Sequence, residues 1–228
     1  MENANKAYRG SLAKNYEKDR VVESIWEKEQ TFIAQYLSKL GRGGSILDVP
    51  VGTGRFINLY LNHGMSVFAV DISEDMLVEV REKFGNTPNI RLERGDVACL
   101  SHGTSSVDYI ICWRLVHLLP KATLAKMICE FARVARKEII IQTYEPKRIA
   151  LRGSLVNKIH YIAGAFLKKL MTAKKNGCKA PWAHIRNFVH SDTEMKSLFS
   201  RYGLLIKETF VIDDAVNRER IYVVKKSP

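Results

Sequence analysis

Long apolar runs, paired cysteines and an apolar leader are all missing from this 228-residue sequence. No segment approaches the roughly 18–20 apolar residues that a membrane-spanning helix needs, and residues 1–6 contain no signal-peptide core. We therefore expect a cytoplasmic protein. The four cysteines form no Cys-x-x-Cys pair and show no zinc-ligand spacing, so we predict buried free thiols and no metal site. They are Cys99, Cys112, Cys129 and Cys178.

Acidic residues are also missing from one long segment, between Glu145 and Asp192. The basic residues of this segment supply much of the net charge of +12, which arises from 36 basic and 24 acidic residues. The segment is partly amphipathic, with apolar residues such as Ile159, Phe166 and Leu170 between the charges. Its basic residues are Lys147, Arg148, Arg152, Lys158, Lys168, Lys169, Lys174, Lys175, Lys179 and Arg186.

The overall composition is that of an ordinary globular chain, with 46% apolar and 26% charged residues. The length suits one α/β domain with a small lid. We therefore predict a single domain over residues 1–228, with an N-terminal helical cap (1–42) and a basic helical lid insert (146–190).

Hydrophobic periodicity predicts alternating strands and helices after a helical region that runs from Ala4 to Leu40. This alternation favours a doubly wound, mostly parallel seven-stranded sheet with helices on both faces. Residues 213–217 are too short for a parallel crossover of about a dozen residues, so we predict an antiparallel last strand. The expected strands are 45–49, 66–71, 89–95, 106–113, 137–144, 204–212 and 220–225, and the expected helices are 55–63, one starting at 73, 121–136 and 191–201.

Glycines and acids follow the first three predicted strands. Gly52 and Gly54 precede a helix, where the backbone can approach a ligand closely and free N–H groups favour negative charge. Asp71 ends the second strand, where an acid can accept hydrogen bonds from both ribose hydroxyls. Asp96 follows the third strand and suits the exocyclic amine of an adenine. Each residue also has a structural alternative: a plain strand–helix turn for the two glycines, a helix cap for Asp71 and a turn-forming role for Asp96.

Taken together, these motifs resemble those of the class I S-adenosylmethionine-dependent methyltransferases. The resemblance extends from about Ile46 to Tyr144 and resumes from Ser191 to Lys225, and it implies S-adenosyl-L-methionine as cofactor. The motifs that carry it are Asp48-x-x-x-Gly52-Thr53-Gly54-Arg55-Phe56, Val70-Asp71-Ile72-Ser73-Glu74-Asp75-Met76-Leu77, Gly95-Asp96 and Val107-Asp108-Tyr109-Ile110-Ile111-Cys112.

The resemblance also implies roles for single residues. Gly52 and Gly54 would border the methionine part of the cofactor, Asp71 would bind the ribose, and Ile72 and Met76 would flank the adenine. Asp71, Ile72 and Met76 thus form the predicted nucleoside side of the site, and the two glycines form part of its methionine side.

Further roles follow from the later motifs. Asp96 and Val97 would contact the edge and face of the adenine, and the backbone near Cys112 and Trp113 would lie close to the methionine amino group. Arg55 would meet the cofactor carboxylate, or would lie in solvent in the first helical turn.

Pro50 departs from the family pattern, which usually has glycine at this position of the loop. Proline fixes φ near −65° and removes an N–H donor, so the turn can form only where neither positive φ nor that hydrogen bond is needed. The same substitution argues against a nicotinamide-dinucleotide enzyme, whose first glycine allows the tight turn.

Methyl transfer from a sulfonium is an in-line displacement, so the protein mainly aligns the acceptor. A base is needed only if the acceptor must lose a proton. Two histidines are the candidates for this role. His117 follows the fourth strand and can equally pack under the cofactor loop, and His190 precedes the late helix. Tyr16 and Arg20 can close the N-terminal helices over the cofactor, or lie on a solvated helix face.

The acid-free insert allows three classes of acceptor. We predict a lid over a small, anionic molecule that is methylated on oxygen or nitrogen. A lipid-linked acceptor on an anionic membrane is the second alternative. RNA is the third, because the insert has no recognisable RNA module and few aromatics for base stacking. A merely solvated basic face, and a non-catalytic module that binds the cofactor, also stay open.

Overall fold

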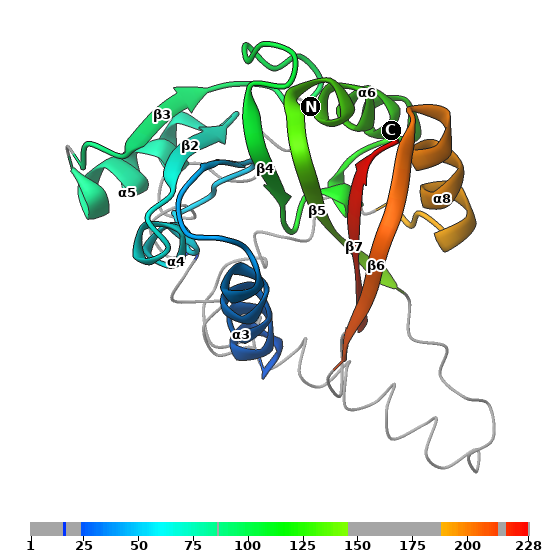
Figure 1. Cartoon of the computed structure of the whole chain (residues 1–228), viewed down its shortest axis with the longest axis horizontal. Helices are drawn as coiled ribbons and strands as arrows, with labels where there is room; N and C mark the ends of the chain where they lie inside the picture. Colours follow the sequence, from blue (N-terminus) through cyan, green and yellow to red (C-terminus); the bar gives the residue numbers. More distant parts are fainter. Residues whose placement is uncertain (1–15, 17–23, 86, 146–187, 214–217, 228) are drawn as a thin grey trace, which may run out of the picture.

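The computed structural model describes residues 16, 24–85, 87–145, 188–213 and 218–227 (Figure 1). These residues form a seven-stranded sheet in the order β3-β2-β1-β4-β5-β7-β6. The predicted lid, up to residue 187, and most of the predicted cap lie outside the described residues. The strands are β1 Ser45–Asp48, β2 Ser66–Asp71, β3 Ile90–Arg94, β4 Val107–Cys112, β5 Ala135–Glu145, β6 Leu204–Asp213 and β7 Arg218–Lys226.

Helices cover both faces of the sheet, as the alternating pattern predicts (Figure 1). Residues of α3, α4 and α5 pack with Ile46 and Ile111 of the strands, whereas α6 and α8 pack with Leu47 and Ile110 on the opposite face. Neighbouring residues of one strand thus serve different cores. The helices are α3 Ser24–Lys39, α4 Ile57–Asn62, α5 Glu74–Phe84, α6 Lys121–Val134 and α8 Asp192–Arg201, with a short 3₁₀ helix η1 at Val116–Leu118.

The directions of the strands confirm the predicted fold class. Strands β1 to β5 pair in parallel, and β7 runs antiparallel between β5 and β6. This arrangement sets Tyr144 of β5 opposite Glu219 of β7, close to the carboxyl end of β5.

Local signals agree with the structure in most places. Ser191, the first residue of the predicted helix 191–201, caps α8, and its hydroxyl accepts a hydrogen bond from the Glu194 N–H at 3.1 Å. Two details differ. Helix α4 begins at Ile57 because the glycine turn occupies the preceding residues. Cys99 and Cys129 are exposed, so only Cys112, among the three described cysteines, is a buried thiol.

The order of the strands defines where a ligand is expected. The chain proceeds outward from β1 to β3 and then crosses back to β4, so the winding reverses between β1 and β4. Ligands of doubly wound folds bind at the carboxyl ends of the strands at this switch point. Within the described ranges, no helix is both long and apolar enough to cross a bilayer.

Candidate cofactor and active site

A pocket opens at the carboxyl ends of β1, β2 and β4, and its empty space, including the open mouth, is about 770 Å³. That size is in the range of small-molecule sites, roughly 300–1,000 Å³. Most of the predicted cofactor residues line it, namely Pro50, Gly52, Arg55, Asp71, Ile72, Met76 and Trp113. The other lining residues are Tyr16, Trp26, Asp48, Val51, Thr53, Phe56, Ser73, Arg114, Leu115 and Leu118.

The carboxylate of Asp71 organises the glycine turn. One oxygen accepts a hydrogen bond from the Gly52 N–H and the other accepts one from the Ser73 N–H, both at 2.9 Å. Gly52 adopts a φ of 54°, in the left-handed region that glycine tolerates best. Burial raises the pKa of Asp71 to about 6, although these backbone donors oppose the rise, so the carboxylate is mostly ionised at neutral pH.

Asp48 lies beside Asp71 at the floor of the pocket and is fully buried. Its carboxyl oxygen accepts a hydrogen bond from the Tyr60 hydroxyl at 3.2 Å. Burial raises the pKa of Asp48 to about 8, and the nearby charge of Asp71 adds to the rise. Asp48 is therefore mostly neutral at pH 7, and Asp71 carries the negative charge of this end of the pocket.

The pocket leaves open space beside the glycine turn. A Cβ atom added at Gly52 would meet nothing within 4 Å, so the turn leaves open space in front of the backbone. The Thr53 hydroxyl oxygen is buried and has no hydrogen-bond partner in the described structure. Apolar walls with a few convergent polar groups are typical of cofactor sites. Asp71, Ile72 and Met76 line this pocket, and their contacts with the ribose and the adenine stay predictions.

Four predicted cofactor residues lie outside the lining of this pocket. A Cβ atom at Gly54 would point into the contact with α5, 2.9 Å from the Phe84 ring. Asp96 accepts a hydrogen bond from the Ala98 N–H at 2.7 Å, so its carboxylate closes its own turn. Val97 and Cys112 are buried in the core that faces α6. Their cofactor roles stay predictions.

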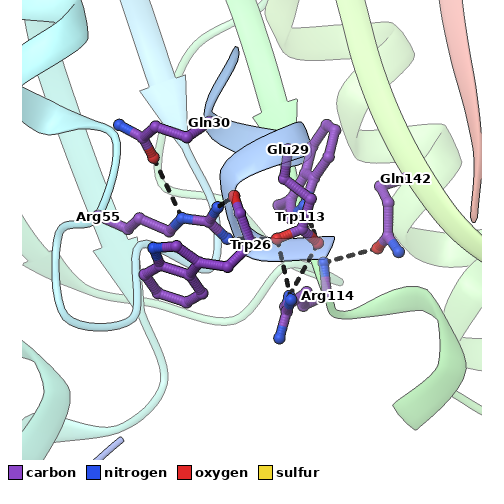
Figure 2. A network of polar contacts seen from close by, with 7 residues as sticks. All are labelled: Trp26, Glu29, Gln30, Arg55, Trp113, Arg114 and Gln142. Carbon is purple, nitrogen blue, oxygen red and sulfur yellow. Dashed lines mark hydrogen bonds and ion pairs between the residues drawn. The ribbon is translucent and has the colours of Figure 1, made fainter. Parts of the chain in front are cut away.

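Arg55 joins the cofactor loop to helix α3 (Figure 2). Its guanidinium donates to Glu29, to the Trp26 carbonyl oxygen and to Gln30, and it stacks on the Trp26 ring at 3.4 Å from the centroid. All three guanidinium nitrogens are thus engaged by α3. The predicted contact between Arg55 and the cofactor carboxylate stays a prediction, although Arg55 does line the pocket.

Glu29 is the centre of this network, and the sequence analysis missed it. Its carboxylate is completely buried and also accepts hydrogen bonds from Trp113 Nε1 at 2.9 Å and from Arg114 at 2.9 and 3.0 Å (Figure 2). Burial would raise its pKa, but the charges of Arg114 and Arg55 hold the pKa below its ordinary value. A sequence signal exists, because Glu29 interrupts the apolar stripe of Ile25 and Ile33.

Glu219 on β7 is a second buried acid next to this network. Its side chain is fully buried and faces the Glu29 carboxylate. Burial, together with the negative charge of Glu29, raises the pKa of Glu219 to about 9. Glu219 is therefore neutral at pH 7, and Arg55 and Arg114 share the single negative charge of Glu29.

This buried acid predicts a pH-dependent stability. Between about pH 5 and 9 the folded protein keeps a proton on Glu219 that the unfolded chain releases, so the free energy of unfolding falls as pH rises. Glu219→Gln should remove about 1–3 kcal/mol of that fall between pH 6 and 9. Urea unfolding at several pH values measures it. The exposed Glu74→Gln variant is the control, and identical pH slopes in wild type and Glu219→Gln would contradict the prediction.

The two candidate base histidines also lie outside the pocket lining. His190 is buried and donates from Nε2 to the Leu119 carbonyl oxygen at 2.9 Å, while its Nδ1 lies 3.6 Å from Glu194. His117 packs edge-to-face on Tyr144, with 4.7 Å between ring centroids. The contact of His190 anchors the start of α8, and the contact of His117 with Tyr144 anchors the end of β5. A role of either histidine as a base stays a prediction.

Comparison with known proteins agrees with this geometry. Residues 46–138 match the sequence family described as a methyltransferase domain. These residues therefore carry a methyltransferase domain, and the chain has the fold of the class I S-adenosylmethionine-dependent methyltransferases. The cofactor of this domain is S-adenosyl-L-methionine, and the matched residues carry the glycine turn, Asp71 and the pocket side of β4.

Curated relatives of the methyltransferase are similar over part of its length. A phosphatidylethanolamine N-methyltransferase from Cereibacter sphaeroides is 35% identical over 105 residues, which are 44% of this chain and 50% of that protein. A probable S-adenosylmethionine-dependent methyltransferase from Mycobacterium tuberculosis is 25% identical over 146 residues, 62% of this chain and 51% of that protein. The match therefore spans about half the length of these two relatives.

A solved structure shows the same fold over nearly the whole chain. Magnesium protoporphyrin IX methyltransferase from Synechocystis PCC 6803, with bound SAH, has a TM-score of 0.68 and 19% identity, and the match covers 99% of this chain and 94% of that one. At this identity the likeness establishes the fold of the methyltransferase and does not define its acceptor.

Proposed function

We propose that this protein transfers a methyl group from S-adenosyl-L-methionine to an oxygen or nitrogen of a small, anionic acceptor. The observation that carries the proposal is the pocket at the β1–β4 switch point, where Asp71 and the Gly52 turn meet apolar walls. When bound, the cofactor supplies an electrophilic methyl group on a good, neutral leaving group. The protein then has to align the acceptor and exclude water.

The charge beside the pocket supports an anionic acceptor. Arg114 and Arg55 line the pocket, and their side chains are only 8% and 10% exposed. They share the charge of Glu29 while Glu219 is neutral, so this cluster of four residues carries net positive charge at pH 7. A partly desolvated positive cluster favours a carboxylated or phosphorylated ligand.

Leu115 and Leu118 form the apolar side of the pocket beyond Arg114. They provide space for the uncharged part of an acceptor. The protein needs a base only for an acceptor that must lose its proton, and His117 and His190 remain the candidates.

A lipid-linked acceptor is the second candidate function. The Cereibacter sphaeroides relative is a phosphatidylethanolamine N-methyltransferase, and a phospholipid headgroup combines an amine with an anionic phosphate. The acid-free segment between Glu145 and Asp192, with its apolar residues, suits binding to an anionic membrane surface. An RNA acceptor and a non-catalytic cofactor-binding module are weaker alternatives.

A methyl-transfer assay distinguishes these functions. The purified protein is incubated with methyl-labelled S-adenosylmethionine and with carboxylated or phosphorylated metabolites, phosphatidylethanolamine vesicles or RNA, and S-adenosylhomocysteine release is measured. We expect turnover with a small anionic acceptor. Turnover only with phosphatidylethanolamine vesicles would reject the small anionic acceptor and would show a lipid-linked acceptor instead. Cofactor binding without turnover on any acceptor would favour the non-catalytic module, and absence of cofactor binding would reject the proposed function.

A further inference from the structure

Helix α3 is tied to the pocket through the carboxylate of Glu29 (Figure 2). That carboxylate accepts hydrogen bonds from Arg55, in the loop after β1, and from Trp113 and Arg114, in the loop after β4. The donors therefore come from two different loops, and one buried side chain on a third element connects them.

Both loops contribute residues to the pocket lining. Arg55 belongs to the cofactor loop that contains Gly52, and Trp113 and Arg114 belong to the loop after β4. Trp26, one turn before Glu29 on α3, also lines the pocket. Its ring lies 3.4 Å from the Arg55 guanidinium carbon and 5.6 Å from that of Arg114. The contacts of Glu29 thus set the positions of three parts of the pocket wall.

The backbone at Arg114 needs this support. Arg114 has a φ of 54°, a left-handed conformation that non-glycine residues rarely adopt and that is found mostly at functional sites. Its N–H donates to the Gln142 side-chain oxygen at 2.9 Å, and its guanidinium donates to Glu29. Gln142 and Glu29 therefore hold the strained residue from both sides, through its backbone and its side chain.

An apolar residue would serve helix packing as well as Glu29 does. Ile25 and Ile33, one turn before and after it, are buried on the same face. Burying a carboxylate carries a desolvation cost that an apolar side chain avoids, and well-packed apolar replacements of buried ion pairs are often as stable. A role restricted to stability thus does not explain why an acid lies at this position.

We infer that Glu29 is a positioning residue, which sets Trp26 and the two loops at the separation that S-adenosylmethionine binding requires. This inference rests on the proposed function, because it assigns Glu29 to the cofactor site of that function. Glu29 acts through Arg55, Trp113 and Arg114. Because its hydrogen bonds join α3 to both loops, the docking of α3 and the formation of the pocket occur together.

The test compares three variants, two at Glu29 and one at Glu130, by calorimetric titration with S-adenosylmethionine. Glu29→Gln keeps the shape and removes the charge, and we expect its Kd to rise about tenfold or more. Glu29→Asp keeps the charge but has a shorter side chain, so its Kd should lie between those of wild type and Glu29→Gln. Glu130→Gln is the matched control, since Glu130 pairs with Arg133 at 2.7 Å and accepts from the Leu100 N–H on the other face of the sheet.

Kinetics give a second readout that a purely structural role would not change. With an identified acceptor, the KM for S-adenosylmethionine should rise about tenfold in Glu29→Gln while kcat at saturation stays within about threefold, as expected for lost ground-state binding. Glu130→Gln should lower the thermal midpoint and leave the Kd within about twofold of wild type.

Each outcome decides the inference. Circular dichroism verifies that the Glu29→Gln and Glu29→Asp proteins are folded. If both folded variants bind S-adenosylmethionine as wild type does, Glu29 is a structural residue only. If Glu29→Gln does not fold, Glu29→Asp carries the decision. Failure of the wild type to bind the cofactor would reject the proposed function and this inference together, whereas wild-type binding with unchanged variants overturns this inference alone.

Discussion

Asp71→Ala is expected to weaken S-adenosylmethionine binding by about 100-fold or more, roughly 2.7 kcal/mol. The substitution removes the proposed ribose partner. It also leaves the Gly52 and Ser73 N–H groups, both 2.9 Å from the carboxylate, without their acceptor, so the glycine turn loses its anchor. Calorimetric titration at pH 7.5 measures the change in Kd.

Two further measurements sharpen this prediction. Glu74→Ala removes an exposed acid three residues along the chain and should leave the Kd unchanged. Because the pKa of Asp71 is about 6, wild-type affinity should also fall below pH 6, as protonation removes an acceptor. Wild-type affinity in Asp71→Ala, or an affinity that rises on acidification, would show that Asp71 does not hold the cofactor.

Gly54→Ala is expected to destabilise the fold by about 2–4 kcal/mol. Gly54 has a φ of 79°, and a Cβ atom there would approach the Phe84 ring to 2.9 Å, Ile57 to 3.0 Å and Val80 to 3.3 Å. Ile57 and Val80 are fully buried, so the neighbours have little freedom to move. The thermal midpoint should drop on the order of 5–15 °C, measured by circular dichroism or calorimetry.

Gly52→Ala separates stability from binding. Gly52 also has positive φ, at 54°, but a Cβ atom there meets nothing within 4 Å. Its stability loss should therefore be limited to backbone strain of about 1 kcal/mol, while the methyl group enters the cofactor space and weakens binding. Equal loss of stability in the two alanine variants would contradict the different surroundings of these glycines.

Much of the fold could be predicted because local and global signals agree. The alternation of buried strands with helices and the short connection between β6 and β7 each point to the observed topology. Strand β2 has the predicted bounds, whereas α4 starts at Ile57. Periodicity cannot separate a glycine turn from the first turn of the helix that follows it.

The cofactor side of the site was predictable because its residues lie at the ends of β1 and β2 and in the loops that directly follow these strands. Asp71 and Gly52 were found in this way, and both line the pocket. Glu29 and Glu219 were missed because their roles arise from contacts between elements far apart in the chain. Only the break in an apolar pattern marks them, and such a break has several possible causes before the partners are known.

The anchoring of β5 and α8 has a consequence for how this enzyme scaffold can be re-engineered. Strand β5 ends at Glu145, which Arg218 and Arg220 bind through ion pairs, and the chain re-enters at Phe188 and His190, bonded to the carbonyl oxygens of His117 and Leu119. The contacts that anchor both junctions are made by residues outside the range 146–187. We therefore expect that replacing this range with the corresponding segment of a relative leaves the affinity for the methyl donor unchanged, which calorimetric titration of the chimeric protein would measure.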